Sequence, residues 1–159
     1  MLRKMTSRAS LPTLVRRLKA AGKKIVFTNG TFDILHLGHV TYLEKAHAQG
    51  DVLIVGVNSD KSVRSYKGPG RPLNSQHDRM GVLAGLGCVD HVVLFEEPTP
   101  LNLILKIRPH VLVKGADWKK SQIAGAREVE SWGGRVKRIK LVAGRSTTRI
   151  LKKMAGRPA

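Results

Sequence analysis

Short runs of aliphatic and β-branched residues alternate along this chain with segments of helical periodicity, and this alternation constrains the fold more than any other feature. The apolar runs predict five buried strands, at residues 24–30, 51–58, 91–95, 110–115 and 135–142. The segments between and after them predict helices, at residues 37–50, 74–87, 100–107, 121–134 and 146–154. Because the strands are rich in Val, Ile and Leu, we expect a mostly parallel five-stranded sheet covered by helices on both faces, which is a doubly wound α/β fold.

The chain has 159 residues, which is enough for one domain with a substantial core. Residues 1–22 predict a basic N-terminal extension with a helix from Leu11 to Ala21, and residues 23–159 predict a single main domain. In a parallel sheet of this kind, ligands bind beyond the carboxyl ends of the strands, where the strand order reverses. The segments expected at that edge are residues 28–39, 58–71, 114–118 and 143–149.

The formal net charge of +18 comes from 29 Lys and Arg residues against 11 Asp and Glu residues, and it is concentrated at the two ends. Residues 1–24 carry eight basic side chains and residues 135–159 carry nine, with no acidic side chain in either segment. Between them, twelve basic residues nearly balance eleven acidic ones. A basic nucleic-acid-binding module is therefore one alternative, although the aromatic content of 4% and the lack of a recognised RNA-binding motif argue against it.

Composition excludes several other classes of protein. A hydrophobic content of 42% excludes disorder of the whole chain. No apolar run approaches the roughly 20 residues that cross a bilayer, so we expect no membrane partner. The single cysteine, Cys88, excludes an internal disulfide framework and a multi-cysteine zinc site, and it fits a reducing cytoplasm as the location.

The most informative segment is TNGTFDILHLGHVTYL, residues 28–43. It predicts a strand that ends near Gly30 and a helix that opens at His36-Leu37-Gly38-His39. Two histidines three residues apart lie on one side of a first helical turn, where free backbone N–H groups and the positive end of the helix dipole point. Gly38 leaves room for a phosphate to approach. This combination suits the charge that develops on a transferring phosphoryl group, whereas the alternatives are two surface histidines or half of a metal site.

TNGTFDILHLGH closely resembles the HxGH signature of the cytidylyltransferase-like superfamily of small nucleotidyltransferases. Further segments, among them VNSDKSVRSYKGPGRPLNSQHDRM, VLVKGADW and GRSTTRILKKM, resemble the adenylyltransferases that activate heptose 1-phosphate for lipopolysaccharide. The resemblance covers roughly residues 24–154 and implies a Rossmann-like fold. It also implies transfer of AMP from ATP to D-glycero-β-D-manno-heptose 1-phosphate, with ADP-heptose and pyrophosphate as products.

The resemblance assigns roles to particular residues. His36 and His39 match the pair that stabilises the transition state at the α-phosphorus, and Lys67 matches the catalytic lysine of a mobile KGxxRP loop. Arg71 and Arg79 are candidates for contact with the substrate phosphate. The residues implied in nucleotide binding are Thr28, Asn29, Gly30, Thr31, Phe32, Asp33, Gly38, Lys114, Gly115, Asp117, Ser146, Thr147 and Thr148.

The residue types agree with several of these roles. Lys67 stands in SYKGPGRP, where Gly68 to Gly70 predict a loop without regular structure that can close over a ligand. Ser146 is a suitable N-cap for the last helix, whose Ile150, Leu151 and Met154 share one face. Arg145, directly before the Ser-Thr segment, departs from the family pattern.

No dense carboxylate cluster occurs in the sequence, so we expect Mg²⁺ to arrive on the nucleotide phosphates and no metal ligand from the chain itself. The expected partners are ATP, a sugar phosphate and a second copy of the chain in a homodimer. Two further alternatives are a cytidylyltransferase that acts on glycerol phosphate or another polyol or sugar phosphate, and a fragment of an aminoacyl-tRNA synthetase. The chain is too short for a synthetase and lacks the second, lysine-rich catalytic loop of those enzymes.

Overall fold

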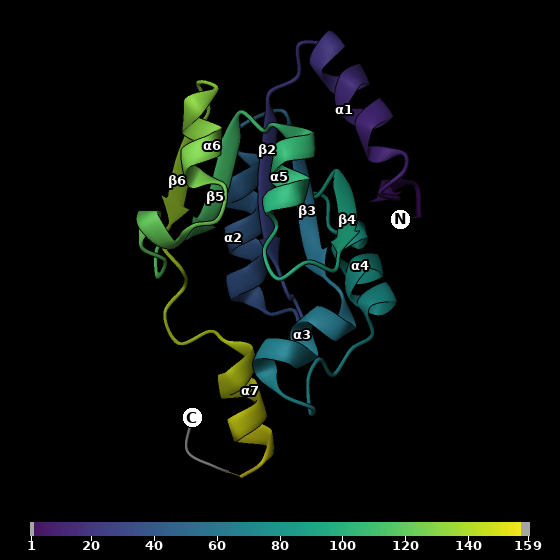
Figure 1. The fold of residues 1–159 in the computed structure, drawn as a ribbon. Coiled ribbons are helices and arrows are strands. Elements are labelled where there is room, and N and C mark those ends of the chain that lie inside the picture. The colour runs from purple at the N-terminus through teal and green to yellow at the C-terminus, as the bar shows by residue number, and fades with distance from the viewer. Residues whose placement is uncertain (1, 157–159) are drawn as a thin grey trace.

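The computed structural model describes residues 2–156 and contains one six-stranded, fully parallel sheet (Figure 1). The strands are β1 (Met5–Thr6), β2 (Ile25–Gly30), β3 (Val52–Asn58), β4 (His91–Phe95), β5 (Val111–Gly115) and β6 (Arg135–Ile139). Their spatial order is β1-β4-β3-β2-β5-β6. The doubly wound α/β fold and the five strands predicted from the sequence are confirmed. The additional strand, β1, pairs with β4 through Met5 and Thr6.

Helices connect the strands and cover the sheet. The α-helices are α1 (Leu11–Ala20), α2 (Leu37–His47), α3 (Asp60–Lys67), α4 (Gln76–Gly85), α5 (Leu101–Ile107), α6 (Ala126–Ser131) and α7 (Thr147–Met154). Short 3₁₀ helices span Leu2–Lys4 and Lys120–Gln122. Within residues 2–156, no helix is both long enough and apolar enough to cross a membrane.

Helix α3 lies in a segment for which the sequence predicts no helix. Ser59 caps its start, because the Ser59 side chain accepts a hydrogen bond from the backbone N–H of Ser62, and Asp60 adds a negative charge to the first turn. Val63 is fully buried and anchors the helix. Lys67 is therefore the last residue of a helix, and the irregular loop begins at Gly68, whose φ of 90° ends the helix.

The core has two layers, one on each side of the sheet, because successive strand residues point to opposite faces. Ile25 and Phe27 of β2 pack with α1, α5 and α6 on one face. Val26, between them, packs with α2 and α4 on the other face. The strand order reverses at β2, which has β3 on one side and β5 on the other. The carboxyl ends of β2 and β5, at Gly30 and Gly115, are thus the expected place for a ligand.

The N-terminal segment packs into the same core. Leu11 of α1 is fully buried, and Leu14 and Val15 join the layer formed by α5 and α6. Arg8 forms an ion pair with Glu97, which fixes the turn before α1 against the loop that follows β4.

We expect Leu11→Ala to lower the free energy of unfolding by about 2–5 kcal/mol, because it leaves a cavity under α1. The exposed Thr13→Ala, on the opposite side of the same helix, is the matched control and should change stability by less than about 0.5 kcal/mol. Urea denaturation monitored by circular dichroism measures both values. Equal stability of the Leu11 variant and the wild type would mean that α1 is a detachable extension.

Helix α7 differs from the other α-helices because it buries none of its residues, and Figure 1 shows it extending away from the sheet. Ser146 is its N-cap, as predicted, and its side chain accepts a hydrogen bond from the backbone N–H of Arg149. The hydroxyl of Thr147 donates to the carbonyl of Ile34, at 3.3 Å, which holds the start of the helix beside the loop that precedes α2.

Candidate active site

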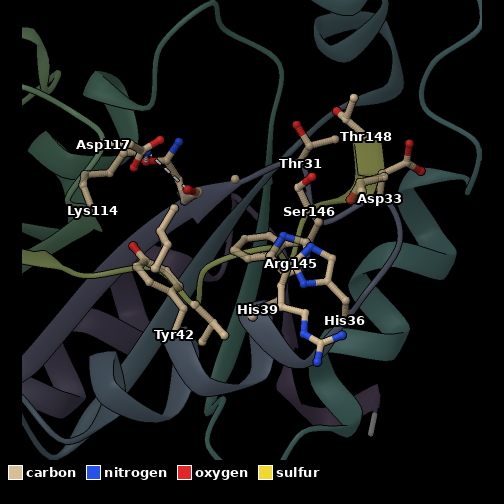
Figure 2. Close-up of a pocket in the computed structure, with 18 of the residues that line it drawn as sticks. Thr31, Asp33, His36, His39, Tyr42, Lys114, Asp117, Arg145, Ser146 and Thr148 are labelled. Atoms are coloured by element: carbon tan, nitrogen blue, oxygen red, sulfur yellow. Dashed lines mark hydrogen bonds between the residues drawn. The ribbon is translucent and has the colours of Figure 1, made fainter. Parts of the chain in front are cut away.

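A cavity of about 390 Å³ lies at the carboxyl ends of β2 and β5, and Figure 2 shows the side chains that converge on it. The cavity is lined by residues from four distant parts of the chain: Asn29, Gly30, Thr31, Phe32, Asp33, His36, Gly38, His39, Tyr42, Lys67, Arg71, Lys114, Gly115, Asp117, Trp118, Leu141, Val142, Arg145, Ser146, Thr147 and Thr148. The structure thus brings together every site residue predicted from the sequence except Thr28 and Arg79.

The two signature histidines are stacked at the N-terminus of α2. Their ring centroids lie 3.9 Å apart with an interplanar angle of 17°, and the ring of Phe32 meets His39 edge-on at 5.2 Å. His36 is the N-cap residue with extended backbone angles, so both rings stand on the first turn of the helix, as the sequence predicts. The Nδ1 atoms of His36 and His39 are buried and have no hydrogen-bond partner among residues 2–156.

Gly38 allows close packing of protein groups, in addition to leaving the room for a phosphate that the sequence suggests. A Cβ atom at this position would lie 3.0 Å from Nδ1 of His36 and 3.1 Å from Cβ of Arg145. Glycine therefore allows the His36 ring and the segment before α7 to approach the same turn of α2.

Burial keeps both imidazoles neutral near pH 7. The pKa of His39 is lowered to about 4, mainly by burial and also by the neighbouring His36 and Lys67. The pKa of His36 is also lowered, first by burial and then by the positive charge of Arg145. A neutral imidazole donates one N–H and carries no net charge. An anionic phosphate that enters the cavity would stabilise the protonated form of both rings, because opposite charges attract.

The low pKa of His39 predicts a specific pH dependence of stability. Between the ordinary value of 6.5 and about 4, the unfolded chain binds a proton at this position that the folded chain does not. The stability contributed by neutral His39 is therefore present above that window and lost as the pH falls through it. The free energy of unfolding of the wild type should fall more steeply between about pH 7 and pH 4 than that of His39→Gln. Parallel curves in denaturant titrations would contradict this assignment.

Two lysines line the cavity, and both have depressed pKa values. Burial lowers the pKa of Lys114 to about 8, and its Nζ atom donates to the carbonyl and side-chain oxygens of Asn29, at 3.3 and 3.1 Å. Burial and the charge of Arg71 lower the pKa of Lys67. Trp118 lies beside Lys114, with 5.1 Å between Nζ and the indole centroid. The cavity thus concentrates positive charge, which suits a polyanionic ligand.

Asp33 faces the cavity but its carboxylate is already occupied. Its oxygens accept from Nε of Arg71 at 2.7 Å and from the backbone N–H groups of Leu73 and Asn74. The other acidic residue that lines the cavity is Asp117, and no group of three or more His, Cys, Asp or Glu side chains gathers around a common point in the part of the chain that the structure describes.

Thr28 and Arg79 lie behind the cavity wall. The Thr28 hydroxyl forms a hydrogen bond with the hydroxyl of Tyr42, at 2.7 Å. The Arg79 side chain is fully buried, and its guanidinium donates to protein acceptors on all sides. Arg79 is therefore not positioned to bind a substrate phosphate, because each of its three guanidinium nitrogens already donates to a protein acceptor.

Tyr42, Leu141 and Val142 also line the cavity, although the sequence did not predict them as site residues. Tyr42 follows His39 by three residues, so helical spacing alone places it on the same face of α2. Leu141 and Val142 follow β6 in the segment that leads to Ser146, and only the path of that segment brings them to the cavity. Arg145 also lines the cavity, next to the histidine pair.

The parallel sheet, the histidine pair at a helix start and the cationic cavity at the switch point define a nucleotidyltransferase domain of the α/β type. The chain belongs to the cytidylyltransferase-like family, whose family model matches residues 27–153.

Curated relatives support the same class. The chain is 50% identical over 154 residues to the bifunctional protein HldE of Pelobacter propionicus, which covers 97% of this chain and 32% of that protein. It is 59% identical over 139 residues to HldE of Pseudomonas aeruginosa, covering 87% of this chain and 29% of that protein. The chain thus spans about a third of the length of these relatives.

Two solved structures share the fold. A lipopolysaccharide core biosynthesis protein from Thermoplasma volcanium superposes with a TM-score of 0.61 at 28% identity, covering 76% of this chain and 98% of that one. A pantoate-beta-alanine ligase from Francisella tularensis, complexed with beta-gamma ATP and beta-alanine, gives a TM-score of 0.59 at 16% identity, covering 94% of this chain and 76% of that one. The second likeness concerns the fold alone.

Proposed function

We propose that this chain transfers AMP from ATP to D-glycero-β-D-manno-heptose 1-phosphate, giving ADP-heptose and pyrophosphate for lipopolysaccharide core synthesis. The observation that carries the proposal is the stacked, neutral pair His36 and His39, which opens α2 inside a cavity rich in cationic side chains. The identity to HldE proteins and the likeness to a lipopolysaccharide core biosynthesis protein favour this acceptor over others.

The reaction is an in-line displacement at the α-phosphorus of ATP. An oxygen of the sugar phosphate forms the new bond to that phosphorus, the bond to the β-phosphate breaks, and pyrophosphate leaves with its electron pair. The attacking phosphate is already anionic near pH 7, so the site needs no strong general base. The N–H groups of His36 and His39 would bind the oxygens of the α-phosphate as charge grows on them, and the cations Lys67 and Arg71 would attract the triphosphate.

We place the nucleotide between two segments that face each other across the cavity. The segment from Lys114 to Trp118 would lie beside the base and ribose, and Ser146 to Thr148, at the start of α7, would bind the triphosphate through hydroxyl and backbone N–H groups. Mg²⁺ would enter on the phosphates, because the chain offers it few oxygen ligands.

A second cavity of about 540 Å³ is the proposed place for the sugar acceptor. It shares Thr31, Lys67 and Lys114 with the nucleotide cavity and continues over Tyr66 and Gln122. The shared lysines thus lie where the acceptor phosphate would meet the α-phosphate of ATP. Hydroxyl and amide side chains on the far wall suit the hydroxyl groups of a sugar.

A pyrophosphate-release assay tests the proposal. ATP and CTP are each paired with heptose 1-phosphate, glycerol 3-phosphate and several other sugar phosphates at fixed Mg²⁺. We expect the highest kcat/KM with ATP and heptose 1-phosphate. A higher value with CTP and glycerol phosphate would favour the cytidylyltransferase alternative. No release with any pair, together with salt-dependent RNA binding, would favour the nucleic-acid-binding alternative.

The proposal also includes a location for the reaction and an oligomeric state for the chain. We place the reaction in the cytoplasm, where a single free cysteine is stable and ATP is available. We also keep the homodimer as a proposal, which sedimentation of the purified chain tests directly.

A further inference from the structure

Two buried charged side chains, Asp33 and Arg79, connect residues 31–36, the proposed phosphate-binding loop between β2 and α2, to the segment that carries Lys67 and Arg71. The Asp33 side chain is 1% exposed and the Arg79 side chain 0% exposed. A buried charge is costly unless it is fully hydrogen-bonded. Each of these two groups has a nearly complete set of partners, and the partners come from separate parts of the chain.

Asp33 binds the loop that follows α3. One carboxylate oxygen accepts from Nε of Arg71 at 2.7 Å, and both oxygens accept from the backbone N–H of Leu73, at 2.9 and 3.0 Å. The N–H of Asn74 donates to Oδ1 at 2.9 Å, and the Asn74 side chain donates to the backbone carbonyl of Asp33. The backbone N–H groups and Arg71 outweigh burial and lower the pKa of Asp33, so it is ionised at neutral pH.

Arg79 forms hydrogen bonds with the phosphate-binding loop and with the segments next to it. Its guanidinium donates to the carbonyl of Thr31 in the phosphate-binding loop, at 2.6 Å, and to the carbonyl of Asn74, at 3.1 Å. It also donates to the carbonyl of Asn58, at the end of β3, and to the carboxylate of Asp60, at the start of α3. The guanidinium of Arg79 thus hydrogen-bonds to the phosphate-binding loop, to the end of β3 and to the start of α3.

Arg71 is left with an unused donor by this arrangement. Its Nε atom binds Asp33, whereas its Nη2 atom is buried and has no hydrogen-bond partner among residues 2–156. Arg71 lines the nucleotide cavity together with Lys67 and Asp33. A buried donor without a partner in a free protein points to a ligand that supplies the acceptor.

We propose that Asp33 is a positioning residue that acts through Arg71. Its carboxylate holds the Nε edge of the guanidinium and the backbone at Leu73 and Asn74, so that Nη2 stays aimed at the triphosphate, and Arg79 keeps this loop in register with the phosphate-binding loop. Asp33 then touches neither the nucleotide nor Mg²⁺. This assignment rests on the proposed nucleotidyl transfer, but its test also has a readout that needs no turnover.

The test is a double-mutant cycle of Asp33→Asn and Arg71→Ala, with kcat and both KM values measured. Asparagine keeps the size of the side chain but loses the charge that pairs with Arg71. We expect Asp33→Asn alone to lower kcat about 100-fold through misplacement of Arg71. In the Arg71→Ala background, the same change should cost less than about threefold, because the residue through which it acts is gone. Equal losses in both backgrounds would overturn the proposal.

Three further measurements keep the test decisive. Asp78→Asn, which alters an exposed cap of α4 in the same region, is the control and should keep wild-type kcat. If Asp33→Asn fails to fold, Arg71→Lys replaces it: a lysine keeps the charge but has no second nitrogen, so full activity of this variant overturns the proposal. If the wild type shows no AMP transfer, the proposed function fails, and calorimetric binding of inorganic tripolyphosphate by the same variants must show the same non-additivity.

Discussion

Replacing His39 with alanine should lower kcat for AMP transfer by about 10²–10³-fold while the fold remains intact. In the proposed reaction, the imidazole N–H would bind the α-phosphate oxygen on which negative charge develops, and burial of the ring makes the loss of this interaction more costly. His36→Ala should have an effect of the same order, because the two rings stack at 3.9 Å and would bind the same phosphate in the proposed reaction.

A matched control exists in the same helix. His47, in the last turn of α2, pairs with Asp90 on the surface and does not line the cavity, so His47→Ala should keep kcat within about twofold of the wild type. Circular dichroism and thermal melts confirm that each variant is folded. Near-normal kcat for both His36→Ala and His39→Ala would refute the proposed role of the pair.

Lys67→Ala should lower kcat by about 100-fold or more, the second large effect that we expect. Lys67, like Lys114, borders both cavities, so its ammonium group would contact the phosphates of nucleotide and acceptor as they meet. Its depressed pKa reflects burial beside Arg71, a cost that bound phosphate would relieve. Rates at saturating concentrations of both substrates separate this effect from weaker binding.

The control for Lys67 lies one turn earlier in α3. Arg64 is exposed and lines neither cavity, so Arg64→Ala removes a positive charge from the same helix without removing a proposed contact. A loss of kcat for Arg64→Ala similar to that for Lys67→Ala would indicate that net charge, rather than the position of Lys67, supports the reaction.

The sequence predicted β2 to β5 well because each of these strands carries a continuous apolar run, whereas β6 places only Val136 and Ile139 among basic residues. It did not predict β1, since Met5 and Thr6 have no periodic pattern, and only their pairing with Val92 and Val93 makes them a strand. It also did not predict α3, where polar residues outnumber apolar ones and the helix depends on the cap at Ser59. Local patterns therefore identified the elements that form the core and missed those that depend on tertiary contacts.

The candidate site could be predicted in part for a related reason. Strand ends and helix starts are visible in the sequence, and the fold gathers the residues that stand there, such as Gly30, His36 and Lys114. The sequence cannot distinguish an arginine that faces a ligand from one that ties the backbone together. Arg71 and Arg79 both come after Gly70. The Nη2 atom of Arg71 has no hydrogen-bond partner among the described residues, whereas each guanidinium nitrogen of Arg79 donates to a protein acceptor.

In the proposed reaction, the α-phosphorus of ATP is the reacting centre. Parallel incubations with heptose 1-phosphate and ATP labelled at either the α- or the γ-phosphorus test this most directly. Nucleotidyl transfer places the α-label in a nucleoside diphosphate sugar and the γ-label in pyrophosphate. A γ-label found on the sugar, or an α-label that remains in free nucleotide while pyrophosphate does not form, would contradict the account.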